Sequence, residues 1–248
     1  MIVLPTLVLY ALTFSAALAR AGHWSLTGSS SRHARHPPKR LLVVGATGGT
    51  GRQLLAQALE QGYAVTALVR NPPKLQVAHE RLTVMQGDVL DYSTVQAAVR
   101  GQDAILCALG HKPYFYPTSI LSGGTRNLLR AMEAHGVPCL VCESSLGIGN
   151  SAGRLGLLFT VLVIPLILPF YFWDKARQER MIAASTIDWV IVRPGVLTNR
   201  AKQGALRHGP QVGSFVRTVN IARADVAAFM LAQLTDDTYL GTAPGVSW

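Results

Sequence analysis

Acidic residues are scarce in this chain of 248 residues: 13 Asp and Glu stand against 23 Lys and Arg, so the formal net charge is +10. Such an excess indicates nucleic-acid binding only where it gathers on the folded part of a protein. Half of the excess precedes residue 41, because residues 1–40 contain no acid and five basic residues, Arg20, Arg32, Arg35, Lys39 and Arg40. We therefore expect no nucleic-acid partner.

The chain also has few cysteines: only Cys107, Cys139 and Cys142. Three cysteines make no disulfide framework, which indicates a reducing compartment, either the cytoplasm or an organelle stroma. Cys139 and Cys142 have C-x-x-C spacing, but in a strand residues three apart face opposite sides of the sheet. No second pair completes a zinc site, and HExxH, G-x-S-x-G and Walker lysine motifs are missing. We expect core cysteines, no metal, and no metalloprotease, hydrolase or P-loop chemistry.

The first residues of the chain are uncharged and almost wholly apolar over 2–18. No basic residue precedes Arg20, whereas a secretory signal begins with a positive region. The stretch from Gly22 to Arg40 is rich in Ser, Arg and His. A targeting segment, a membrane anchor and an over-extended start all stay open. We expect residues 1–38 to lie outside the fold and residues 39–248 to form one domain.

A second uncharged apolar run extends from Leu155 to Trp173 and is long enough to span a bilayer. Pro165 and Pro169 interrupt it, and strand-like segments of one predicted sheet lie on both sides of it. A spanning segment would divide that sheet. We therefore expect residues 155–173 to form an apolar wall of a substrate pocket or, like residues 1–19, to contact a membrane surface.

From residue 39 onward, apolar strand-like runs alternate with amphipathic helix-like segments. The expected strands are 41–45, 64–69, 82–86, 104–108, 139–143 and 189–193, and the expected helices are 50–61, 93–99, 120–135, 175–184 and 224–234. This alternation predicts a single-domain α/β fold with a Rossmann-type, doubly wound parallel sheet. Such sheets bind their ligands at the carboxyl ends of the strands.

A glycine-rich turn joins the first predicted strand to the first predicted helix. It has G-x-x-G-x-x-G spacing and reads Gly45-Ala46-Thr47-Gly48-Gly49-Thr50-Gly51. Glycines permit a tight turn and a close approach of the backbone to a pyrophosphate, whose charge is favoured at a helix N-terminus. Because the motif stands between a buried strand and an amphipathic helix, it predicts a dinucleotide site.

The residue at the end of the second predicted strand indicates which dinucleotide the site binds. NAD binders usually carry an acid there, about 20 residues beyond the glycines, to bind the ribose 2′-hydroxyl. This chain has Arg70, followed by Asn71-Pro72-Pro73-Lys74. A guanidinium suits a 2′-phosphate. We therefore expect NADP(H) to be preferred over NAD(H), the alternative being that Arg70 is an ordinary surface residue.

Several further motifs carry a family resemblance. They are Leu68-Val-Arg-Asn-Pro72, Gly87-Asp88-Val89, Ala108-Leu109-Gly110, Ser144-Ser-Leu-Gly147, Asp174-Lys175 with Glu179, and Trp189-Val-Ile-Val-Arg-Pro-Gly195. Over about residues 39–241 the chain resembles the atypical short-chain dehydrogenases/reductases of the NAD(P)H-binding type, which include biliverdin reductase B-like flavin reductases and NmrA-like proteins. Its motifs on the nucleotide side are specific, whereas those on the substrate side are not.

The resemblance also implies which residues contact the cofactor. Asp88 and Val89 would flank the adenine, and residues Ala108, Leu109 and Gly110 would pass under the ribose and diphosphate. Residues Pro194, Gly195 and Val196 would lie near the nicotinamide. Topology agrees, since these segments follow the carboxyl ends of predicted strands.

Three residues are candidates for catalysis: Ser144, Tyr171 and Lys175. Tyr171 and Lys175 have the Y-x-x-x-K spacing of ordinary short-chain dehydrogenases, where the lysine lowers the tyrosine pKa and binds the ribose, although Pro169 predicts that Tyr171 precedes the helix. A hydroxyl at Ser144 binds substrate in the resembling families. The alternative is that Ser144 satisfies backbone groups at a strand end.

The loop after the fourth predicted strand carries His111, Lys112, Tyr114, Phe115 and Tyr116. Its aromatic rings are suited to stack on a planar acceptor, Lys112 to meet a carboxylate or phosphate, and His111 to act as an acid. The alternative is a loop that only covers the edge of the sheet.

The sequence thus supports an NADPH-dependent oxidoreductase that transfers hydride to a planar, largely apolar small-molecule acceptor such as a flavin, quinone or tetrapyrrole. A non-catalytic NADP(H)-binding redox sensor of the NmrA-like type is the alternative. Isomerase or dehydratase chemistry fits the fold but has no residue signature.

Overall fold

The structure is a computed structural model that describes residues 3–22, 37–111, 114 and 116–248. Within these residues, an eight-stranded sheet has the order β3-β2-β1-β4-β5-β6-β10-β8. The strands are β1 (Arg40–Val44), β2 (Ala64–Val69), β3 (Leu82–Gln86), β4 (Ala104–Cys107), β5 (Cys139–Glu143), β6 (Asp188–Pro194), β8 (Arg207–Gly209) and β10 (Gly245–Ser247). All neighbours are parallel except β8, which pairs antiparallel to β10. This confirms the doubly wound, Rossmann-type sheet.

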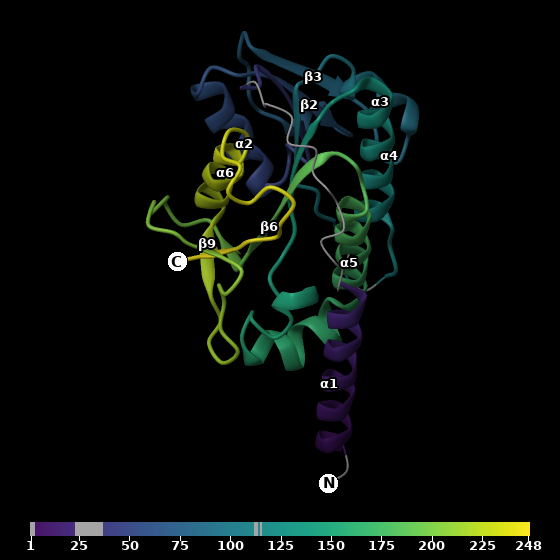
Figure 1. The fold of residues 1–248 in the computed structure, drawn as a ribbon, viewed down its shortest axis with the longest axis vertical. Helices are drawn as coiled ribbons and strands as arrows, with labels where there is room; N and C mark the ends of the chain where they lie inside the picture. Colours follow the sequence, from purple (N-terminus) through teal and green to yellow (C-terminus); the bar gives the residue numbers. More distant parts are fainter. Residues whose placement is uncertain (1–2, 23–36, 112–113, 115) are drawn as a thin grey trace.

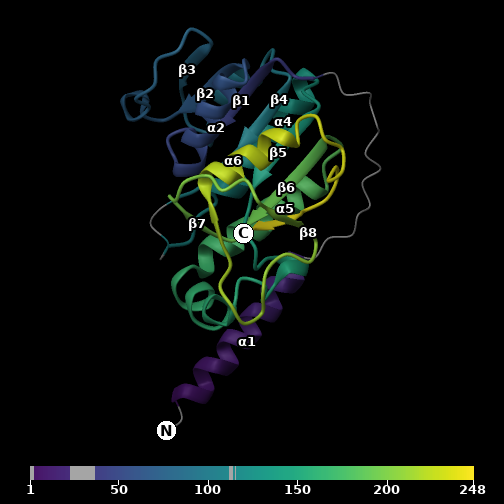
Figure 2. The same cartoon turned by 90° about the vertical axis from the view of Figure 1, so that its left-hand side faces the viewer.

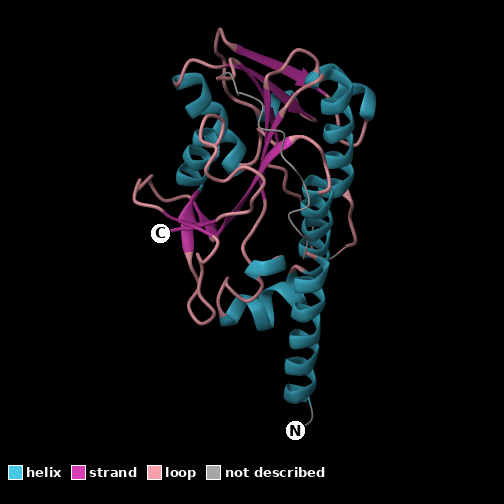
Figure 3. Ribbon diagram, viewed as in Figure 1, coloured by secondary structure: helices cyan, strands magenta, loops and turns pink. Residues whose placement is uncertain are grey.

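Helices cover both faces of the sheet. They are α2 (Gly49–Glu60), α3 (Tyr92–Val99), α4 (Ile120–His135), α5 (Pro169–Ala183) and α6 (Arg223–Ala232). Helices α2 and α6 pack together on one face, and α3, α4 and α5 form a row on the other (Figures 1 and 3). Two short strands, β7 (Val196–Thr198) and β9 (Asn220–Ala222), make a separate parallel pair.

The period of two along each strand divides the core into two clusters. Leu41 and Val43 of β1 pack under α2 and α6, whereas Leu42 and Val44 pack under α3 and α4. The same alternation sends Cys139 to the first cluster and Cys142 to the second. The prediction that these cysteines are core residues on opposite faces is therefore confirmed, and all three cysteines are buried and outside any disulfide.

One expected boundary is wrong. Helix α5 begins at Pro169 rather than at residue 175, so Tyr171 lies inside the helix and does not precede it. Proline is tolerated in the first helical turn, because its missing N–H would have no intrahelical partner there and its fixed φ suits the helix. Pro169 therefore starts α5, and Tyr171 and Lys175 stand four residues apart on one helix.

The second apolar run folds as a short π-helix, η3 (Phe159–Ile167), which joins α5 through Leu168. The N-terminal helix α1 (Val3–Ala21) lies along it (Figure 2). Leu18 of α1 is buried in a cluster with Ile164 and Phe172. The division of the chain at residue 38 stays a prediction, but α1 contacts the apolar segment of the domain.

Among the described residues, no single helix combines the length and hydropathy needed to cross a bilayer. The pair Phe159–Ile167 and Pro169–Ala183 meets those criteria together, and it is bent by 96°.

Candidate functional site

A cleft of about 510 Å³ opens at the carboxyl ends of β1, β2, β4 and β5. Its size falls within the range of about 300–1,000 Å³ that is typical of small-molecule sites. Most residues predicted from the sequence line it, namely Gly45, Thr47, Gly48, Gly49, Thr50, Arg70, Asp88, Val89, Ala108, Leu109, Gly110, Ser144, Tyr171 and Lys175. Residues from six separate parts of the chain thus meet where such sheets bind ligands.

Four predicted residues lie outside the lining. Gly51 packs inside the loop, because a Cβ there would lie 2.1 Å from the carbonyl oxygen of Gly45. Pro194, Gly195 and Val196 lead from β6 into β7, where the Val196 N–H donates to the Val219 carbonyl at 2.8 Å. The residue that reaches the cleft from this segment is Leu197.

The glycine-rich loop presents bare backbone to the cleft. Gly45 has a φ of +86°, and a Cβ on it would lie 2.3 Å from the carbonyl oxygen of Ala108. The Gly48 N–H donates to the Gly45 carbonyl at 2.9 Å and closes the turn. Helix α2 then begins with no side-chain cap and no acid in its first turn. Its first N–H groups are free to bind an anion, so the loop fits a pyrophosphate.

Two arginines flank this loop. Arg70 is exposed at the end of β2, where the sequence places it. Arg223, the first residue of α6, was missed from the sequence. Its side chain lies against Gly49, because a Cβ built on Gly49 would come within 2.5 Å of the Arg223 Nε. Arg223 Nη1 also donates to Asn199 Oδ1 at 2.7 Å. Sequence position alone could not separate Arg223 from an ordinary surface arginine, because α2 and α6 meet only in the folded chain.

The residues after β3 form the side wall of the cleft. The Asp88 carboxylate accepts the Leu90 N–H at 2.9 Å and so holds its own turn. The Val89 carbonyl accepts a hydrogen bond from Asn127 Nδ2 at 3.0 Å, and the Val89 side chain is buried against Gly124. This wall is therefore held in place by hydrogen bonds and packing, and it presents the apolar Val89 next to the Asp88 carboxylate.

Tyr171 and Lys175 form the opposite wall, on one face of α5. Lys175 Nζ lies 5.2 Å from the centre of the Tyr171 ring and donates to the Glu143 carbonyl at 3.3 Å. Burial lowers the pKa of Lys175, but Tyr171, Glu143, Cys142 and Glu179 together leave that pKa above its ordinary value. Burial raises the pKa of Tyr171, and Lys175 opposes this rise only in part. At neutral pH the lysine is charged and the phenol keeps its proton.

A buried carboxylate, missed from the sequence, lies at the floor of the cleft. Glu143 ends β5 and accepts a hydrogen bond from Thr50 Oγ1 at 2.9 Å. Burial raises the pKa of Glu143, while Lys175, Thr50 and Arg223 act to lower it. An acid at the end of an otherwise apolar strand was the signal that could have found it.

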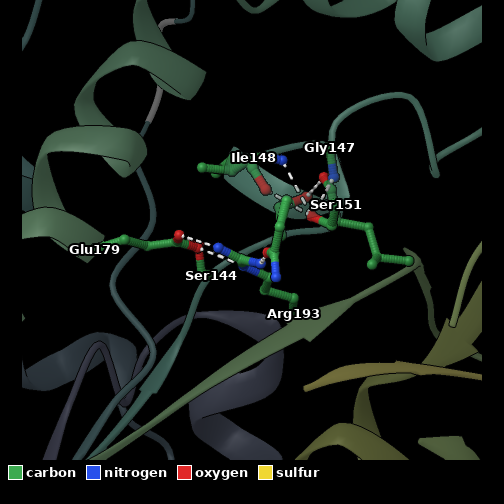
Figure 4. A network of polar contacts seen from close by, with 9 residues as sticks. Ser144, Gly147, Ile148, Ser151, Glu179 and Arg193 are labelled. Atoms are coloured by element: carbon green, nitrogen blue, oxygen red, sulfur yellow. Dashed lines mark hydrogen bonds and ion pairs between the residues drawn. The ribbon is translucent and has the colours of Figure 1, made fainter. Parts of the chain in front are cut away.

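Ser144 is held by a buried ion pair (Figure 4). Its hydroxyl donates to Glu179 Oε1 at 2.5 Å, and the same carboxylate accepts Arg193 Nε at 3.0 Å and Nη2 at 2.6 Å. Arg193 also donates to Asn150 Oδ1. The hydroxyl hydrogen of Ser144 is therefore committed, but its oxygen lone pairs remain able to accept a hydrogen bond from a ligand.

Aromatic rings cover Tyr171 at the mouth of the cleft. The His111 ring stacks on it with centroids 5.4 Å apart and planes inclined by 13°, and Tyr114 meets it edge-on at 5.6 Å. Neither ring nitrogen of His111 has a hydrogen-bond partner among the described residues. Tyr116 is exposed and does not line the cleft, and Lys112 and Phe115 lie outside the described residues.

Comparison with known proteins agrees with this geometry. Residues 45–237 match the family of NAD(P)H-binding domains. The chain belongs to this NAD(P)H-binding family. An uncharacterized chloroplastic protein of Arabidopsis thaliana is 32% identical over 181 residues, which cover 70% of this chain and 64% of that protein. The chain spans less than two thirds of the length of the curated relatives it matches.

Solved structures share the fold. An anaerobillin reductase of Escherichia coli O157:H7 is 24% identical with a TM-score of 0.69, and the match covers 84% of this chain and 96% of that one. A short-chain dehydrogenase/reductase of Veillonella parvula, solved in complex with NADP, is 19% identical with a TM-score of 0.67, over 85% and 95% of the two chains.

In this member of the NAD(P)H-binding family, the cleft joins two chemically different halves. The loop at Gly45–Gly49 with Arg223 offers N–H groups and a cation, which suit phosphates. The half near Tyr171 offers a protonated phenol, a buried ammonium and aromatic rings. The first half can hold a dinucleotide, and the second can orient an acceptor and donate a proton.

Proposed function

We propose that this protein is an NADPH-dependent reductase that transfers hydride to a planar, largely apolar acceptor such as a flavin, quinone or tetrapyrrole. One observation carries the proposal: the phenol of Tyr171 and the ammonium of Lys175 line the same cleft as the glycine-rich loop. A site that only bound a dinucleotide would not need a buried proton donor with a cation beside it.

When bound, NADPH supplies the hydride. The protein itself has four further tasks. Lys175 holds a positive charge beside Tyr171, and Tyr171 carries the proton that a reduced acceptor takes up. Ser144 accepts a hydrogen bond with the lone pairs that Glu179 leaves unused. The His111 ring, which stacks on Tyr171, and the Tyr114 ring, which meets Tyr171 edge-on, give a planar acceptor an aromatic surface.

The preference for NADPH over NADH rests on Arg70. Its guanidinium is exposed at the rim, and no acid stands between it and Glu80. Two more cations, Arg52 and Lys74, lie next to each other near this rim. Arg52 Nη2 donates a hydrogen bond to the Lys74 carbonyl at 3.2 Å. A positive rim of this kind favours a ribose 2′-phosphate over a 2′-hydroxyl.

We also propose a reducing compartment, either the cytoplasm or an organelle stroma. None of the three cysteines forms a disulfide, and two Arabidopsis relatives are chloroplastic proteins. Neither fact depends on the identity of the acceptor.

The test is NADPH consumption by the purified full chain against flavin mononucleotide, a quinone panel and biliverdin. We expect consumption that depends on one acceptor class and that falls when Lys175 is changed to Ala. Tight NADPH binding without consumption above background would contradict the reductase and favour the redox sensor.

A further inference from the structure

One end of the molecule exposes apolar side chains from segments that are far apart in the sequence. In Figures 1 and 2, α1, η3 and the loop before β9 lie together at the end opposite β2 and β3. We call a set of six exposed apolar residues on η3, its flanks and this loop the apolar end: Leu157, Leu158, Leu162, Phe170, Phe215 and Val216. Phe215 and Val216 are 62% and 75% exposed.

These segments form one continuous surface. The Leu157 N–H donates to the Val216 carbonyl at 3.3 Å, which places the loop beside the start of η3. On the other side, α1 is attached by hydrogen bonds from Tyr10 to the Pro165 carbonyl at 3.4 Å and from Ser15 to the Thr160 carbonyl at 3.2 Å. Exposed apolar residues so close together mark an interaction site.

The surface is also firmly supported from below. Leu155 and Ile164 are buried with Phe172 in the third hydrophobic cluster, so the same segment turns one apolar side inward and another outward. The outward side chains therefore sit on a packed base and are not exposed by fraying of the segment.

Charge around the apolar end has a single sign. Residues 144–173 contain no acid and one base, Arg154, and residues 189–224 contain no acid at all. Arg154 lies over the Phe215 ring at 5.2 Å, and Arg217 is exposed next to Val216. The charged residues named beside these exposed leucine and phenylalanine side chains are arginines. This combination complements the interface of an anionic bilayer, where apolar side chains enter the headgroup boundary and cations contact phosphates.

We propose that the apolar end docks this protein on the surface of an anionic lipid bilayer. Leu158, Leu162 and Phe215 would enter the interface, with Arg154 and Arg217 at the headgroups. The bend of 96° between η3 and α5 turns α5 into the domain, where Lys175 and Glu179 are buried. The inference does not depend on hydride transfer, because no residue of the apolar end lines the cleft.

The test is cosedimentation of the full chain with phosphatidylcholine vesicles that contain phosphatidylglycerol. We expect the wild type to sediment with them, and the variant Leu158→Asp with Leu162→Asp to bind about tenfold or more weakly, because two apolar contacts are replaced by charges that the lipid repels. Val77→Asp is the matched control, since Val77 is exposed away from this end. Unchanged NADPH binding and circular dichroism verify folding.

Further variants distinguish lipid binding by the apolar end from lipid binding by α1 and from dimerisation. Phe215→Ser changes a loop side chain, so it tests the same surface without altering a helix, and Arg217→Gln should weaken binding to anionic vesicles only. The proposal is overturned if the wild type stays in the supernatant, if Leu9→Asp in α1 alone abolishes binding while Phe215→Ser does not, or if the apolar end drives dimerisation and vesicles do not compete with it.

Discussion

Ser144 and Arg193 share one carboxylate. Glu179 accepts the Ser144 hydroxyl at 2.5 Å and both the Nε and Nη2 groups of Arg193, and all three side chains are buried. The arrangement ties the end of β5 and strand β6 to helix α5, which carries Tyr171 and Lys175. The position of the proposed proton donor relative to the strand ends therefore depends on an ion pair outside the cleft lining.

Glu179→Gln should lower the free energy of unfolding by about 3–5 kcal/mol, because it leaves the buried guanidinium of Arg193 without its counter-charge. Chemical denaturation measures the change. Glu133→Gln, at an exposed position on α4, is the control and should stay within about 0.5 kcal/mol of the wild type. Equal stability of the two variants would contradict the assigned role of the ion pair.

Arg70→Ala should raise the dissociation constant for NADPH about tenfold or more and leave that for NADH nearly unchanged. A charge-assisted hydrogen bond is worth about 1.5–3 kcal/mol, and NADH has no 2′-phosphate to receive it. Titration calorimetry with both dinucleotides measures the difference. Arg100→Ala, which changes an exposed arginine outside the cleft, should alter neither constant. Equal weakening of both ligands would place Arg70 elsewhere than at the 2′-phosphate.

Arg223→Ala gives the complementary pattern. Because Arg223 lies against Gly49 in the glycine-rich loop, it faces the part common to both dinucleotides. We expect both dissociation constants to rise by a similar factor of about ten. The same calorimetric titrations measure this, with Arg70→Ala as the comparison. A loss confined to NADPH would assign Arg223 to the 2′-phosphate instead.

Sequence patterns predicted the regular elements well, because those elements are decided locally. The strands at 64–69, 82–86 and 139–143 and the helix at 120–135 have the boundaries that periodicity indicates. The three-residue strands β7 to β10 were not predicted, since three residues are too few to show an alternation. Pro169 was misjudged because a proline can equally end a segment or start a helix.

The residues of the candidate site also fall into those that local sequence patterns indicated and those that were missed. Glycine spacing and the strand-end positions pointed to the nucleotide half of the cleft, because those signals are contiguous in sequence. Glu143 did carry a local signal, an acid at the end of an apolar strand, but that signal was not used. Arg223 was missed because it reaches the cleft only through the packing of α6 on α2. The contact of α1 with η3 was likewise invisible, since nothing in an apolar run tells which apolar partner it will meet.

Tyr171→Phe should lower kcat for the acceptor by about 100-fold or more, which is the usual contribution of a positioned proton donor. Tyr116→Phe, which removes the hydroxyl of an exposed tyrosine outside the lining, should leave kcat unchanged.

The pH dependence of the rate gives a second test of Tyr171 as the proton donor. Burial raises the pKa of Tyr171 above its ordinary value of 10.0, so the protonated form that donates persists as pH rises through neutrality. The wild-type rate should therefore show no loss from Tyr171 between about pH 6 and pH 9 and should fall only in more alkaline solution. An unchanged kcat in Tyr171→Phe would assign the proton to solvent or to His111, whereas a tenfold loss near neutral pH in the wild type would show that Tyr171 ionises too readily to be the donor.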